Sequence, residues 1–185
     1  MDMSSIGSVS GIQEVLSALL PALIKLCQDS VAAVRLAAGS QLGLTIARID
    51  WRTTSGTAFD GDMITASAHV CQLASSAAFQ HRQVYALAFE SIAKAKLSET
   101  VLGLFWPAFA TLVSDAVPNV RLAVCHTLLN LILRPKGGGD TDLRHGCTSP
   151  TTVAQTPVLD MALVLIDDSD QEVARVARLV VDSMS

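Results

Sequence analysis

Apolar residues recur every three to four positions in four successive stretches of the chain, which is the spacing of one face of an α-helix. The second half of three stretches carries an apolar stripe: Val34, Ala38, Leu42 and Thr45 or Ile46; Val117, Val120, Val124, Leu128 and Leu131; and Val173, Val176, Val180 and Met184. The first halves are apolar on nearly every side, as in residues 19–26. Such helices need neighbours on several faces. The pattern therefore predicts an all-α fold of packed helical pairs.

Two of these stretches match each other closely, beginning at residues 19 and 104. In both, a proline precedes an aspartate by eight residues, and a Val-Arg-Leu-Ala sequence begins five residues after that aspartate. The matched residues are Pro21, Asp29, Val34 and Arg35 in one stretch, and Pro107, Asp115, Val120 and Arg121 in the other. Self-similarity of this length is typical of stacked helical repeats.

Two weaker copies lie between and after the matched pair. In the copy between them, Val84 aligns with the repeat valine, which puts Phe79 in the place of the aspartate and Tyr85 in that of the arginine. In the last copy Asp168 keeps the aspartate position, and the arginine is displaced to Arg175. The chain therefore contains four copies of one helical-pair unit.

We expect one domain over residues 1–185, built from four helical hairpins that stack into an α-solenoid superhelix. The expected hairpins cover about 12–49, 62–96, 98–134 and 156–184, with polar, Gly-rich loops inserted at 50–61 and 135–155. A longer array that includes this chain stays open. Low surface charge and an unmatched first helix are unlike the polar caps that solenoid ends require.

Aspartates precede the second helix of three copies, at Asp29, Asp115 and Asp168. Each carboxylate is expected to cap that helix, because the first-turn N–H groups lack partners and the helix dipole favours negative charge there. Pro21 and Pro107 lie inside the first helix of their copies, where proline kinks a helix. The sequence therefore predicts a common turn and a common bend in successive units.

The composition excludes several classes of protein. Half of the residues are hydrophobic and 16% are charged, which excludes an intrinsically disordered chain. The net charge of −4 supplies no basic field for phosphates, so we expect no nucleic-acid partner. No apolar run reaches the roughly 20 residues of a membrane span, so we expect no membrane insertion. Without metal-ligand spacing, the four cysteines (Cys27, Cys71, Cys125 and Cys147) are interpreted as reduced core thiols of a cytoplasmic protein, with a nuclear location left open.

No set of residues in the sequence converges on a reaction or a cofactor. The four histidines are not followed by glutamate, and no zinc, nucleotide or serine-hydrolase motif is present. Cys125 and His126 are adjacent on one helix and point about 100° apart. Asp60 and Asp62 lack the remaining ligands of a calcium loop and are expected to cap a helix. We therefore expect no enzymatic activity, no cofactor and no metal.

The repeated pattern resembles the HEAT repeat, particularly the version in the scaffold subunit of protein phosphatase 2A and in phosphatase 4 regulatory subunits. The residues that carry the resemblance are Leu20, Pro21, Asp29, Val34, Arg35 and Ala38 in one repeat, and Trp106, Pro107, Asp115, Val120, Arg121 and Val124 in the other. The resemblance implies four HEAT-like hairpins with a ladder of turn residues between repeats, formed by Asp29, Arg35, Asp115, Arg121 and Asp168. Within it, Asp115 should meet an arginine of an adjacent repeat, either Arg82 or Arg175.

The resemblance also implies a non-catalytic scaffold that binds other proteins, as a regulatory or scaffold subunit of a serine/threonine phosphatase complex. Such scaffolds commonly bind the catalytic subunit through the turns within repeats, which here lie at 28–32, 76–81, 114–119 and 167–171. The concave face lined by the second helices is a further expected surface. The expected contact residues, with an exposed aromatic side chain among them, are Phe79, His81, Arg82, Tyr85, Val117 and Asn119.

A transport or cytoskeletal adaptor that binds other proteins is the alternative function. Tubulin binders favour basic turns, whereas these turns carry aspartates, which argues against that kind of adaptor. Ser149 and Thr156 each precede a proline, as in the minimal site of proline-directed kinases, and the sequence leaves their phosphorylation open.

Overall fold

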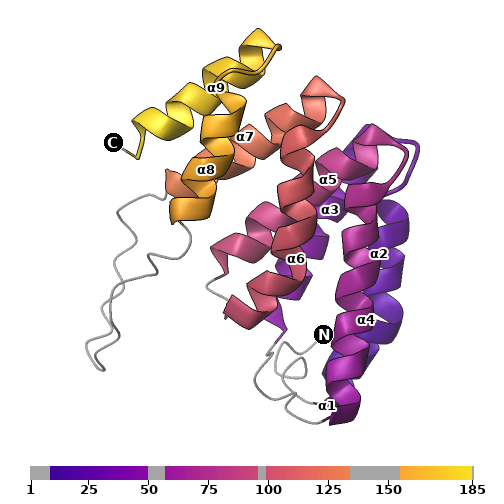
Figure 1. Cartoon of the computed structure of the whole chain (residues 1–185). Helices are drawn as coiled ribbons and strands as arrows, with labels where there is room; N and C mark the ends of the chain where they lie inside the picture. The colour runs from indigo at the N-terminus through magenta and orange to yellow at the C-terminus, as the bar shows by residue number, and fades with distance from the viewer. Residues whose placement is uncertain (1–8, 50–56, 96–98, 134–154, 185) are drawn as a thin grey trace, which may run out of the picture.

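The computed structural model describes residues 9–49, 57–95, 99–133 and 155–184. These residues form helices and the turns between them, and they contain no strand. Successive helical pairs stack along one direction, from indigo to yellow in Figure 1. The chain is an all-α solenoid, as the apolar periodicity predicts.

Each unit joins a first helix to a second helix across a short turn. The first unit comprises α1 (Val9–Glu14), a π-helical turn (Val15–Leu19), α2 (Leu20–Leu26) and α3 (Ala32–Arg48). The later units pair α4 (Thr57–Cys71) with α5 (Phe79–Lys94), α6 (Glu99–Thr111) with α7 (Pro118–Ile132), and α8 (Gln155–Leu165) with α9 (Gln171–Asp182). Short 3-10 turns (Gln72–Ser75 and Leu112–Ser114) follow α4 and α6.

The second helices form one layer of the solenoid. Helices α3, α5, α7 and α9 pack side by side in chain order, each against the next. The first helices cover this layer, with α2 on α3, α6 on α5 and α8 on α9. The turns within the units consequently lie along one edge of the stack (Figure 1).

A continuous apolar core runs between the layers and includes an aromatic cluster between the second and third units. The rings of Phe89 and Phe109 stack with centroids 4.2 Å apart, and the ring of Trp106 lies 5.6 Å from that of Phe89. Tyr85 is fully buried, and its hydroxyl donates to the carbonyl of Phe105 at 2.8 Å. The prediction of an exposed Tyr85 is therefore wrong, because α5 directs this side chain toward α6.

The second unit is offset by three residues from the alignment that its sequence suggests. Helix α5 begins three residues before Arg82, just as α7 begins three residues before Arg121. Arg82 is therefore the repeat arginine, and the assignment of Tyr85 to that role is wrong. The repeat valine is replaced by His81, so Val84, which is buried one helical turn later, gives a misleading apolar match.

Several expectations concern residues near or beyond the described ranges. Segments 50–56 and 134–154, with Cys147 and Ser149, lie outside the described residues. Thr156 lies within α8. Asp60 and Asp62 lie inside α4, so the expectation that they cap a helix is wrong; α4 begins earlier, at Thr57, and includes the end of the expected loop.

The two repeat prolines occupy different local structures. Pro21 stands in the first turn of α2, directly after the π-helical turn. Pro107 lies inside α6, which continues through it without a change of helix type. The common position in the repeat therefore does not produce the same irregularity in both units.

Helices α3 and α5 approach each other so closely that α3 needs glycine at the contact. A Cβ atom on Gly43 would lie 2.3 Å from the carbonyl oxygen of Ala88 and 2.7 Å from the Cβ of Ser91. The backbone oxygen cannot move aside in the way that a long side chain could. The absence of a side chain at Gly43 therefore sets the spacing between α3 and α5.

We predict that Gly43→Ala lowers the free energy of unfolding by about 1–3 kcal/mol, because the added methyl group forces the two helices apart. The matched control is Gly103→Ala in α6, where a Cβ atom would meet nothing within 4 Å. That change should raise stability by about 0.5–1 kcal/mol through helix propensity. Urea denaturation followed by circular dichroism measures both, and equal effects of the two substitutions would contradict the close contact.

Candidate functional site

The turns of all four units share one hydrogen bond. A side-chain oxygen of the turn residue accepts from the backbone N–H two residues later, which is an Asx turn or its serine equivalent. The acceptor and donor pairs are Asp29 with Val31 at 2.7 Å, Ser76 with Ala78 at 3.3 Å, Asp115 with Val117 at 2.8 Å, and Asp168 with Asp170 at 2.8 Å. Ser76, and not Phe79, is thus the turn residue of the second unit.

The predicted capping role of the turn aspartates needs correction. The N–H that each accepts belongs to the residue just before the helix, whereas a capping side chain accepts from the first turn of the helix. Of the four residues that directly precede the second helices, only Asp170 caps its helix: its side chain accepts from the N–H groups of Glu172 and Val173 at the start of α9. Asp115 and its equivalents therefore stabilise the turn rather than the first helical turn.

An arginine six residues after the turn residue anchors each of the first three turns. Its Nη1 donates to the carbonyl oxygen of that turn residue: Arg35 to Asp29 at 2.8 Å, Arg82 to Ser76 at 2.7 Å, and Arg121 to Asp115 at 2.6 Å. The guanidinium is planar and rigid. A fixed Nη1 therefore also fixes the direction of the opposite edge, which carries Nε and Nη2.

In two units this second edge reaches the turn aspartate of the next unit. Arg82 donates from Nε and Nη2 to the two carboxylate oxygens of Asp115, at 2.6 and 2.9 Å. Arg121 does the same to Asp168, at 2.6 and 2.7 Å. We call each of these bidentate pairs a rung and the series the ladder. The prediction that Asp115 meets Arg82 is confirmed.

Arg175, the other candidate partner of Asp115, does not pair with it, so that prediction is wrong. Arg175 lies one position beyond the repeat arginine, whose place in α9 is taken by the buried Ala174. Its guanidinium pairs with Glu172 on its own helix, at 2.7 Å. The side chains of that pair are about half exposed, at 57% and 52%, whereas Asp115 and Asp168 in the rungs are 7% and 6% exposed. The rungs are therefore shielded from water and the α9 pair is not.

The rungs lower the pKa values of both aspartates below their ordinary 3.8. For Asp115, burial acts to raise the pKa, and this is outweighed by the hydrogen bonds from Arg82 and the Val117 N–H and by the charges of Arg82 and Arg121. For Asp168, the hydrogen bonds from Arg121 are the main cause, and they prevail over burial. Both carboxylates are therefore held ionised by the ladder.

The first unit departs from the ladder. Arg35 keeps the anchor to its own turn, but among the described residues no carboxylate accepts from its Nε and Nη2. The position that should supply the carboxylate in the second unit is Ser76. The Oγ of Ser76 instead lies 2.9 Å from Nδ1 of His81 and accepts from the Ala78 N–H. One ladder position is therefore open.

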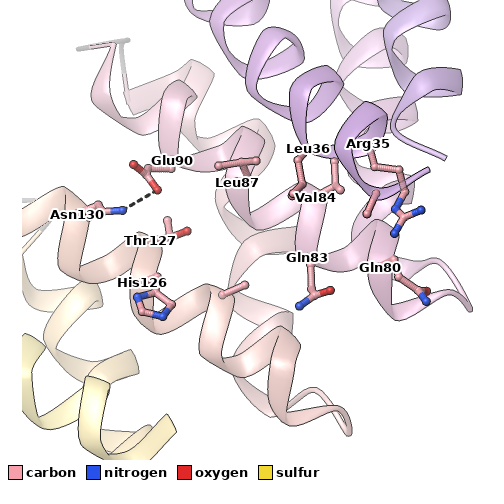
Figure 2. A pocket seen from close by; sticks show the side chains of 12 residues that line it. Arg35, Leu36, Gln80, Gln83, Val84, Leu87, Glu90, His126, Thr127 and Asn130 are labelled. Carbon is pink, nitrogen blue, oxygen red and sulfur yellow. Dashed lines mark hydrogen bonds between the residues drawn. The ribbon is translucent and has the colours of Figure 1, made fainter. Parts of the chain in front are cut away.

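Beside this open position, a groove of about 430 Å³ crosses α3, α5 and α7 (Figure 2). The groove is lined by Ala32, Arg35, Leu36, Gln80, Gln83, Val84, Leu87, Glu90, Ala123, His126, Thr127 and Asn130. These residues lie at helical spacing on the three second helices, so the groove lies on the layer of second helices, which is the expected concave face. We call it the concave groove.

Amide and hydroxyl groups of the concave groove are held in place by partners on neighbouring helices. Gln83 donates from Nε2 to the carbonyl of Asn119 at 3.1 Å, and Asn130 donates from Nδ2 to Glu90 at 3.1 Å. The hydroxyl of Thr127 donates to the carbonyl of Ala86 at 3.2 Å. Each of these bonds uses one N–H of the amide and fixes the amide's direction, so the side-chain oxygens of Gln83 and Asn130 are held as oriented acceptors. Such groups suit the backbone N–H groups of another chain.

The residues expected to contact partners fall into different environments. Arg82 is occupied in the ladder, His81 lies against Ser76, and Tyr85 is buried in the core. Phe79 and Val117 are partly buried, and only Asn119 is exposed. The sequence-based set therefore does not form one surface. The expected contact residues include none of those that line the concave groove, although the polar lining residues of α5 recur at helical spacing.

The described residues hold no cluster of three or more His, Cys, Asp or Glu side chains that could bind a metal ion. Burial raises the pKa of the Cys27 thiol to about 11 and that of Cys125 to about 12, which disfavours a nucleophilic thiolate. The Cys125 thiol is buried against α9 while His126 is exposed to the groove, so the two do not form a catalytic pair. No described helix is long and apolar enough to cross a membrane.

Comparison with known proteins agrees with this geometry. The family model of the HEAT repeat matches residues 19–44, which include α2, the first turn with Asp29, and Arg35 at the open ladder position. No curated protein matches the chain. The match supports a HEAT-repeat protein, and a HEAT repeat is consistent with a role in binding other proteins.

We predict that Asp115→Ala lowers the free energy of unfolding by about 2–3 kcal/mol, since it removes both the turn hydrogen bond and a shielded charged pair. Glu172→Ala, which breaks the exposed pair on α9, is the control and should leave the unfolding free energy unchanged within error. Chemical denaturation of both variants measures the difference. A loss no larger than that of the control would mean that the ladder does not stabilise the stack.

The lowered pKa values of Asp115 and Asp168 predict a loss of stability in acid. A carboxyl group whose pKa is lower in the folded state contributes stability that is complete above the ordinary value of 3.8 and is lost as the pH falls through the folded-state value. The free energy of unfolding should therefore fall with decreasing pH below about 4. The double variant Asp115→Asn, Asp168→Asn should show a smaller fall, measured by urea denaturation across this range, and an unchanged acid slope would contradict the prediction.

Proposed function

We propose that this protein is a non-catalytic scaffold that binds another protein in the concave groove. The observation that carries the proposal is the groove itself, which spans three successive helices and combines apolar contact area with oriented hydrogen-bonding groups. Leu36 is 53% exposed at its edge, so its apolar side chain is accessible to a partner that lies in the groove. Glu90 is the one acidic residue among the lining side chains.

The ladder suits this role because it holds the second helices in a fixed arrangement. A groove formed by three helices keeps its shape only if those helices do not slide relative to each other. The two rungs and the close α3–α5 contact at Gly43 limit such sliding. A preformed surface loses less conformational entropy on binding, which raises affinity without additional contacts. The scaffold would act by tethering and orienting its partner, thereby raising the effective concentration.

A finer proposal is that the partner belongs to a serine/threonine phosphatase complex in the cytoplasm or nucleus. Its support is the resemblance of the first and third repeats to phosphatase scaffold and regulatory subunits. In those scaffolds the turns within repeats commonly bind the catalytic subunit. Here the corresponding edge presents exposed residues at each turn, among them Val31, Ala77, Ala116 and Asn119. Leu36 lines the groove and Asn119 does not, so substitutions at these two residues compare the contributions of the groove and the turn edge to binding.

We predict that Leu36→Glu abolishes or weakens partner binding at least about ten-fold, since a charge replaces an apolar contact in the groove. Leu163→Glu is the matched control, because Leu163 is 45% exposed on α8 and does not line the groove. Affinity purification with quantitative mass spectrometry compares both variants with the unmodified protein. A partner lost only with Leu36→Glu supports the groove, and identical partner sets in all three would contradict it.

The phosphatase proposal has its own test. A purified serine/threonine phosphatase catalytic subunit should bind the immobilised full chain, measured by interferometry, and Asn119→Glu on the turn edge should weaken that binding. Leu163→Glu should not. Absence of binding by the catalytic subunit, together with partners of another class in the mass spectrometry, would favour an adaptor over a phosphatase subunit.

A further inference from the structure

The open ladder position lies at one end of the concave groove, and it has the properties of a binding site for a carboxylate. Arg35 is both the repeat arginine of the first unit and a lining residue of the groove. We propose that its free guanidinium edge binds an aspartate or glutamate side chain of the partner protein, in the way that Arg82 binds Asp115. The inference rests on the proposed function, because the partner segment must lie in the groove.

The guanidinium of Arg35 is oriented before any partner binds. Its Nη1 donates to the carbonyl oxygens of Asp29 and Ser30, each at 2.8 Å. Arg82 makes the same two bonds in its own turn, to Ser76 at 2.7 Å and Ala77 at 3.2 Å. Because the anchors match, the Nε and Nη2 edge of Arg35 should have the same direction as the edge that Arg82 presents to Asp115. The Arg35 side chain is thus already ordered within its unit, so it loses less conformational entropy when a partner binds.

The chain does not supply the missing carboxylate from the second unit. Ser76 occupies the position that is Asp115 in the third unit and Asp168 in the fourth. Its side chain is shorter than an aspartate by one carbonyl group, and its Oγ is used by the Ala78 N–H and by His81. The turn is therefore complete without a bond to Arg35, and an acceptor for Arg35 can come from outside the chain.

The groove gives an extended segment access to this arginine. Arg35 and Leu36 come from α3, and Gln80 and Gln83 face them from α5 (Figure 2). An acidic residue on Arg35 would place the adjoining backbone along the two glutamines, whose amides pair with peptide N–H and C=O groups. An apolar residue of the segment would cover Leu36. At the other end of the groove, Glu90 already accepts from Lys94 and Asn130. Arg35 is the one lysine or arginine among the lining residues, so the acidic residue of the segment should lie at the Arg35 end.

Charge favours a carboxylate over a phosphate at this position. In both complete rungs, one arginine with a single positive charge binds one carboxylate with a single negative charge. Asp29, whose backbone carbonyl anchors Arg35, carries a further negative charge in the same turn. A phosphate, with its charge of about −1.5 to −2, would meet stronger repulsion from that aspartate than a carboxylate would. The two complete rungs and the charge of Asp29 therefore both favour a carboxylate over a phosphate at Arg35.

The test uses random dodecapeptides displayed on phage and selected on the immobilised full chain. We expect the selected peptides to share one aspartate or glutamate next to an apolar residue. A selected peptide should lose affinity about ten-fold when its acid is replaced by the amide, which is the typical strength of a charged hydrogen bond. With the Arg35→Gln variant, acid and amide peptides should bind equally.

Ser76→Asp provides a second variant that does not weaken the fold. It restores the ladder carboxylate within the chain, so it should raise thermal stability and weaken the acidic peptide about as much as Arg35→Gln does. Arg178→Gln on α9, which is outside the groove, is the control and should leave peptide affinity unchanged.

The outcomes distinguish this inference from the proposed function. Selected peptides that compete with one another but share no acidic residue, or whose acid-to-amide loss persists in Arg35→Gln, would overturn the carboxylate site and leave groove binding intact. If no peptide is selected, and Leu36→Glu also removes no partner, the proposed function fails as well. A phosphoserine peptide without carboxylates that binds more tightly than the acidic peptide, and depends on Arg35, would overturn the choice of carboxylate.

Discussion

The arrangement of this solenoid depends on the bidentate pair between an arginine of one unit and the turn aspartate of the next. Apolar packing between α5, α7 and α9 is strong but non-directional, and it would tolerate small displacements of one helix along another. The pairs Arg82–Asp115 and Arg121–Asp168 allow no such displacement, because two parallel hydrogen bonds fix both position and angle. Each arginine is fixed in turn by its own turn carbonyl. The ladder thus transmits the geometry of one turn to the next.

The sequence predicts a large part of this structure because the decisive signals are local. The helical periodicity of the apolar residues indicates the all-α fold, and the six-residue interval between Asp115 and Arg121 indicates a common turn. The pairing of Asp115 with Arg82 follows from the HEAT resemblance alone. It does not appear in the alignment, since the second unit has Ser76 and His81 in place of the repeat aspartate and valine. The anchor that identifies Arg82 is a backbone carbonyl, which any residue type supplies.

Other features depend on contacts between units and could not be predicted from one segment. Tyr85 occupies a position that could face either water or the next unit, and only the packing of α6 on α5 decides that it is buried. The concave groove combines side chains from α3, α5 and α7 that are far apart in the sequence. Its presence follows from the spacing of these helices. At the α3–α5 contact, that spacing depends on Gly43 having no side chain.

The solenoid therefore uses one arginine position for two purposes. In the second and third units the arginine is largely shielded against a carboxylate of the chain and stabilises the stack, so that it has no remaining donor edge for a partner. In the first unit the same arginine keeps its anchor, but no described carboxylate accepts from its Nε and Nη2, and there it lines the groove. A binding group gains most when a rigid scaffold orients it and leaves it unsatisfied until the partner arrives. The replacement of an aspartate by Ser76 creates this condition with a single residue, while the two rungs that follow keep the rest of the stack in place.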